Sequence, residues 1–131
     1  MRTSRTRQTI ALTPRDAIVP AGWSTSVAGG TSTAAASATG VVTLTGDGTN
    51  AARADQAINT IKGRRYRLTV AASAAVSVSV GTGVGDASLA SQTVTGSGDV
   101  FFTASGAVTY IRLLRTAVGA TVVTNLTSRV T

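Results

Sequence analysis

The amino-acid sequence predicts an all-β protein, on two observations. Thr, Val, Ser, Ala and Gly dominate the 131 residues. Glu is absent and Lys occurs once, whereas a helical protein of this length is normally rich in Leu, Glu, Lys and Gln. From Val41 onward, apolar and polar residues alternate in short runs, and turn-forming residues separate these runs about every ten positions. This spacing predicts a single β-sandwich or barrel.

The first twenty residues are predicted to form a basic N-terminal arm. Three of its arginines, Arg2, Arg5 and Arg7, stand among Thr and Ser. Two prolines, Pro14 and Pro20, bias the residues before them toward extended backbone. Such a segment is disordered when alone in water, so either a neighbouring chain or its own domain is expected to hold it. The basic start is not followed by an apolar run, so no secretory signal is predicted.

Residues 21–131 are predicted to be the sandwich domain. Its first part, residues 21–40, is low in complexity and predicts either a loose first strand with a long loop or a flexible linker. Trp23 is the one large side chain in this part. Its apolar area favours a place in the core or at a sheet edge over a role as a ligand platform.

The remaining residues predict eight strands, so the sandwich has eight or nine antiparallel strands in all. The glycines of Gly96–Gly98 predict a hairpin between the fifth and sixth of them. Residues 50–58 are the best helix candidate, but the alternation of their neighbours favours a strand. The predicted strands are Val41–Thr45, Arg53–Ile58, Arg65–Ala72, Ala75–Gly81, Ser88–Val94, Asp99–Ala104, Ala107–Arg115 and Ala120–Val130.

Alternation also predicts which side chains face the core. In Ala107–Arg115, Ile111 and Leu113 point to one side of the strand while Tyr110 and Arg112 point to the other. The arginines of the strands are therefore predicted to line outer faces. The same holds for Arg65–Ala72, whose Tyr, Leu and Val face inward.

The net charge of +7 predicts affinity for anionic partners, which include nucleic acid, acidic glycans and acidic protein surfaces, or simply a solvated basic surface. Eleven Arg and one Lys stand against five Asp. Four of these cations fall within six residues: Lys62, Arg64, Arg65 and Arg67.

Several short motifs occur in a familiar order. They are T-G-D-G (45–48), Q-A-I (56–58), Y-R-L-T (66–69), V-S-V-G-T (78–82), F-T-A (102–104) and T-Y-I-R-L (109–113). Over residues 22–130 this order resembles the carbohydrate-binding-module-like jelly-roll domains of bacteriophage virion proteins. The resemblance implies a jelly-roll β-sandwich. It also implies a place in a tail fibre, a baseplate appendage, a capsid decoration or a secreted glycan-active enzyme.

The residue types argue against catalysis. His and Glu are absent, and the five Asp are scattered, so neither a catalytic triad nor a general acid–base pair is predicted. Asp47 and Asp86 are the carboxylates to consider for a glycosidase pair or a calcium site, but the glycines beside them favour turns. No enzyme activity, cofactor or metal is predicted.

The first functional expectation is a non-enzymatic phage virion protein that decorates or cements the capsid as an oligomer. Its partner would be the major capsid protein or another virion protein. The arm would make contact through Arg2, Arg5 and Arg7, and the body through Lys62, Arg64, Arg65 and Arg67.

Two alternatives stay open. The first is a glycan-binding adhesion module of a tail fibre or baseplate, or part of a secreted enzyme, with Trp23 and Tyr110 as candidate sugar contacts. The second is a nucleic-acid-binding protein, in which Tyr66 and Tyr110 are the aromatics available for base stacking. No membrane partner is predicted, because no run approaches the ~18 apolar residues of a membrane span.

Overall fold

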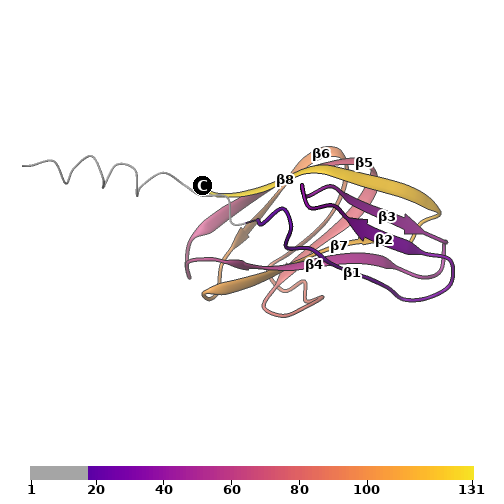
Figure 1. Cartoon of the computed structure of the whole chain (residues 1–131). Helices are drawn as coiled ribbons and strands as arrows, with labels where there is room; N and C mark the ends of the chain where they lie inside the picture. Colours follow the sequence, from indigo (N-terminus) through magenta and orange to yellow (C-terminus); the bar gives the residue numbers. More distant parts are fainter. Residues whose placement is uncertain (1–17) are drawn as a thin grey trace, which may run out of the picture.

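The computed structural model describes residues 18–131, without the side chain of Asn125, and the predicted all-β class is confirmed there. No helix in this part of the chain is long and apolar enough to cross a membrane. The eight strands, labelled in Figure 1, are β1 (Ser24–Val27), β2 (Thr33–Ala36), β3 (Val42–Gly46), β4 (Ala52–Asn59), β5 (Arg65–Gly81), β6 (Ala90–Thr103), β7 (Val108–Arg115) and β8 (Gly119–Val130).

The strands form an antiparallel jelly-roll sandwich, as predicted. They are hydrogen-bonded in the order β1-β4-β7-β5-β8-β3-β2, and β6 runs along β5. The long strand β5 joins two layers, because its first half (66–72) pairs with β8 and its second half (77–81) pairs with β7. We call β1, β4, β7 and the second half of β5 the first layer, and β2, β3, β8 and the first half of β5 the second layer (Figure 1).

The core lies between the layers and consists of the inward-facing residues that alternation predicts. Val76, Val78 and Val80 are fully buried, and so are Leu44 and Leu113. Polar side chains at the alternate positions keep the outer faces hydrated. The large β-branched and leucine side chains of both layers thus supply most of the stabilising apolar burial.

The predicted boundaries within β5 and β6 were wrong. Arg65–Ala72 and Ala75–Gly81 form one strand, and the predicted hairpin between Ser88–Val94 and Asp99–Ala104 is the interior of β6. The register of the pair jumps from Ala72 opposite Gly96 to Val76 opposite Val94, so β5 carries a bulge there. Gly96 has a φ of 76°, which lets β6 follow the bend without a turn.

Residues 18–40 are more ordered than their composition predicts. Residues 21–40 contain two short strands, β1 and β2, paired with β4 and β3. Ile18 and Val19, which the sequence assigns to the arm, pack on the sandwich: Ile18 is buried, and the backbone of Val19 exchanges two hydrogen bonds with the Gln56 amide. The helix candidate at residues 50–58 is strand β4.

Candidate functional site

A groove of about 280 Å³ lies on the outer face of the first layer. Strands β1 and β4 form much of it, and Tyr110 of β7 and Val84 of the β5–β6 loop complete it. Tyr110 is half-buried, so part of its ring faces the groove, and Val84 is 64% exposed. The lining residues are Gly22, Ser24, Thr25, Ser26, Asp55, Gln56, Ala57, Val84 and Tyr110.

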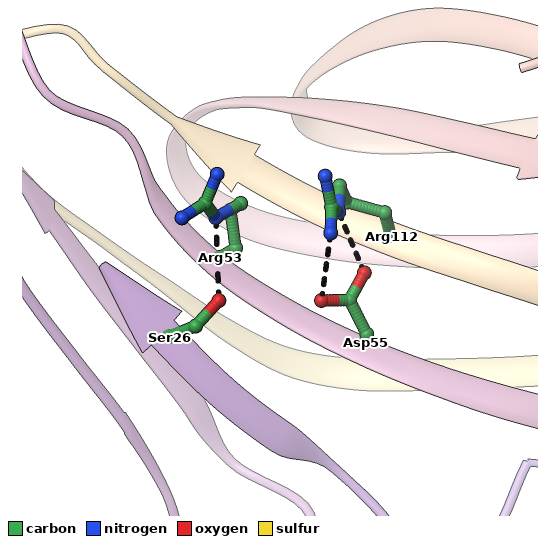
Figure 2. Close-up of polar contacts among 4 residues, drawn as sticks. All are labelled: Ser26, Arg53, Asp55 and Arg112. Carbon is green, nitrogen blue, oxygen red and sulfur yellow. Dashed lines mark hydrogen bonds and ion pairs between the residues drawn. The ribbon is translucent and has the colours of Figure 1, made fainter. Parts of the chain in front are cut away.

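An ion pair joins the two strands beneath this groove (Figure 2). Asp55 of β4 and Arg112 of β7 are register partners, and both side chains project from the same outer face. The Arg112 guanidinium donates two hydrogen bonds to the carboxylate, from Nε to Oδ1 at 2.6 Å and from Nη2 to Oδ2 at 3.2 Å. This two-pronged geometry fixes both side chains in one orientation.

A second polar contact holds the edge strand of the layer. The Nε atom of Arg53 donates a hydrogen bond of 3.2 Å to the hydroxyl of Ser26, which lies opposite it on β1 (Figure 2). Gln56, on the inner side of β4, is buried and binds the backbone of Val19. Side chains on both faces of β4 therefore fix the groove's wall.

The β5–β6 loop is shaped by Asp86. Its carboxylate accepts hydrogen bonds from the backbone and hydroxyl of Thr82 and from the hydroxyl of Ser88, and these bonds lower the pKa of Asp86 to about 2. Gly85 has a φ of 78°, and a Cβ there would lie 2.7 Å from Nη1 of Arg112. The loop therefore packs closely over Arg112 and presents Val84 to the groove.

Asp47 also makes a turn, which the glycines beside it predict. Its carboxylate accepts hydrogen bonds from the backbone of Thr31, Thr49 and Asn50 and from the Asn50 side chain, and these bonds hold its pKa well below the usual range for aspartate. Among the described residues, no group of three or more His, Cys, Asp or Glu side chains gathers to hold a metal ion. Asp47 and Asp86 therefore each stabilise a loop.

The predicted aromatic contacts are separated by the fold. Tyr110 lines the groove, whereas Trp23 is only 9% exposed and belongs to the core. Tyr66 is also buried, stacked on Phe102 with ring centroids 5.4 Å apart, and its hydroxyl accepts a hydrogen bond from the backbone of Ile61. Tyr66 therefore offers no ring face for a base or a sugar.

The predicted cationic contacts do not lie at the groove. Arg65 and Arg67 project from the outer face of the second layer, and Lys62 and Arg64 lie exposed in the β4–β5 loop. Arg2, Arg5 and Arg7 lie outside the described residues. The Asp55–Arg112 pair was not predicted from the sequence, because β4 and β7 are far apart in the chain. The signal that could have revealed this pair was the outward position of both side chains on their predicted strands.

Neither protein-family models nor curated proteins match this chain. Solved structures do. A structure titled "CBM4 structure and function" matches with a TM-score of 0.62 and 15% identity over 86% of this chain and 88% of that one. A mutant of a family 29 carbohydrate-binding module matches with a TM-score of 0.54 and 11% identity over 90% and 91%. The chain has the fold of a carbohydrate-binding module.

A third match comes from a phage. The enzymatically active domain of tailspike protein 4 of bacteriophage CBA120 has a TM-score of 0.58 and 17% identity, over 86% of this chain. This chain spans about a fifth of that protein, with 20% covered. The carbohydrate-binding-module-like jelly roll is thus confirmed. None of these three structures is a capsid decoration protein.

Proposed function

We propose that this protein is a non-catalytic glycan-binding module whose ligand lies in the groove of the first layer. The groove with Tyr110 carries this proposal. It is a concave surface that combines an aromatic ring and an apolar side chain with a few fixed polar groups, which is the usual makeup of a small-ligand site.

Each part of the groove has a role in this proposal. Tyr110 packs against the apolar face of a sugar ring, and Val84 adds a second apolar side chain to the lining. The Asp55 carboxylate retains lone pairs for sugar hydroxyls, because its two bonds to Arg112 use only part of its accepting capacity. Ser24 and Ser26 add hydroxyls along the β1 wall. Because the ion pair and the loop are already held in place, ligand binding costs little conformational entropy.

The carboxylates support a binding role over a catalytic one. A glycosidase places two carboxyl groups on either side of the scissile bond. Asp55 is the one carboxylate that lines the groove, and it is paired with Arg112. The other described aspartates are engaged elsewhere, Asp47 and Asp86 in loops and Asp99 with the hydroxyl of Thr69.

The tailspike match supports a place for this module in a phage tail appendage, where it would attach the virion to a surface glycan. The matched carbohydrate-binding modules support equally well a place for this module within a secreted glycan-active enzyme. A glycan bound by the purified chain identifies the ligand class in either setting.

A glycan array probed with the purified chain, followed by calorimetric titration of the best ligand, tests the proposal. We expect Tyr110→Ala to reduce the affinity about fivefold or more, since one well-placed aromatic contact is worth on the order of 1 kcal/mol or more. Val118→Ala is the control, because Val118 is 74% exposed and does not line the groove. Binding that survives Tyr110→Ala, or no glycan binding at all, contradicts the proposal.

A further inference from the structure

Three arginines converge on the outer face of the second layer. Arg65 and Arg67 alternate with the buried Tyr66 and Leu68 along β5, so both point outward. Arg129 of β8 is the register partner of Arg67 and is also exposed. We call Arg65, Arg67 and Arg129 the arginine patch. The sequence predicted the first two as partner contacts but not Arg129, which lies 62 positions after Arg67 in the chain.

The pairing of Arg67 with Arg129 costs stability. Residues opposite each other on neighbouring strands have Cβ atoms about 5 Å apart, and like charges at that distance repel. Among the residues described, the one ion pair is that of Arg112 with Asp55, so no carboxylate forms an ion pair with the patch. Asp99 lies nearby on the same face and accepts a hydrogen bond from Thr69. With three arginines and one aspartate, this face carries a net positive charge.

We propose that the arginine patch binds an anionic polysaccharide, at a site separate from the groove. Guanidinium groups bind carboxylate and sulfate through paired hydrogen bonds. Arg65 and Arg67 are spaced about 7 Å apart along the strand, and Arg129 lies beside them. The three guanidinium groups can therefore bind anionic groups that repeat along a polysaccharide. Exposed Lys62 and Arg64 extend the positive field into the β4–β5 loop.

The patch suits this ligand better than nucleic acid or a folded protein. Single-stranded nucleic acid is bound by stacking bases on free aromatic rings. The ring on this face, that of Phe101, has the Arg65 guanidinium stacked on it, with the guanidinium carbon 4.7 Å from the ring centroid, so that face of the ring is not free for a base. A protein interface needs an apolar centre, and the one aromatic ring here lies beneath a charge.

Titration of the full chain with heparin, with neutral dextran as a blank, tests the proposal. We expect the double variant Arg67→Gln/Arg129→Gln to bind heparin about tenfold more weakly at low salt. The slope of log affinity against log salt should fall by about two, one for each cation removed. The melting temperature should stay equal or rise, because the repulsion is gone.

Two single variants separate the patch from the net charge. Arg53→Gln removes one charge from the other layer and should change heparin affinity less than twofold. Asp99→Asn removes a carboxylate from the patch face and should strengthen binding. Equal losses of heparin affinity in Arg53→Gln and in Arg67→Gln alone would reduce the effect to net charge and overturn the proposal. Tighter binding of duplex DNA than of heparin at the same ionic strength would assign the patch to nucleic acid instead.

Discussion

Arg112 and Asp55 face each other across β7 and β4 and form two hydrogen bonds, of 2.6 and 3.2 Å. Their side chains are 20% and 17% exposed, so solvent screens the pair only in part. The pair lies under the groove, and the β5–β6 loop packs over the arginine. It therefore links the two strands and the loop that shape the proposed ligand site.

Removing this pair should reduce both stability and affinity. We expect Arg112→Ala to lower the free energy of unfolding by about 1–3 kcal/mol, because it leaves the Asp55 carboxylate without its charged donors. Urea unfolding measures this loss. Arg53→Gln is the control, since Arg53 makes one hydrogen bond, to a serine hydroxyl, and its loss should cost about 1 kcal/mol or less. Equal effects of the two variants would show that the ion pair adds nothing.

The end of β5 and the loop that follows it offer a matched pair of glycines, Gly81 and Gly83. A Cβ at Gly81 would overlap the backbone carbonyl of Asp86, whereas a Cβ at Gly83 meets no atom within 4 Å. Gly81→Ala should therefore destabilise the fold by about 1–3 kcal/mol and weaken glycan binding by displacing Val84. Gly83→Ala should leave stability and affinity nearly unchanged. Thermal unfolding and calorimetry compare the two, and similar behaviour of both variants would contradict the loop's packing.

Trp23 should act through stability alone. Because it is 9% exposed in the core, Trp23→Ala should cost about 3–5 kcal/mol in free energy of unfolding. Where the variant stays folded at low temperature, its glycan affinity should equal that of the wild type. A variant that keeps wild-type stability but loses affinity would return Trp23 to the role of a sugar contact.

Acid should destabilise the fold through the loop aspartates. The folded-state pKa of Asp86, about 2, lies below the ordinary aspartate value of 3.8, and the pKa of Asp47 is lowered further. The unfolded chain therefore binds more protons between these values, so stability falls as the pH drops from about 4 toward 2. Chemical unfolding at several pH values measures the slope. The double variant Asp47→Asn/Asp86→Asn should flatten it, and an unchanged slope would exclude these groups as the cause.

Local pattern predicted most of the fold because side-chain alternation and turn residues are local properties. Val76 to Val80 and Ile111 to Leu113 face the core as alternation requires. The bend of β5 was not predictable in this way. A bulge opposite Gly96 resembles two strands and a hairpin in sequence, and only pairing with both β7 and β8 keeps the strand continuous.

The candidate site was less predictable, because it depends on which strands become neighbours. Tyr110 was identified from its outward position, but the approach of Asp55 to Arg112 and of Arg67 to Arg129 follows from register. The apolar area of Trp23 favoured a place in the core or at a sheet edge, and Trp23 does belong to the core.

The location of the glycan tests the account most directly. Backbone amide chemical shifts of the isotope-labelled chain, followed during titration with the best ligand from the array, report which residues the ligand approaches. The account predicts shifts around Asp55, Val84 and Tyr110 in the first layer. Shifts confined to the second layer, or none at saturating glycan, would contradict it.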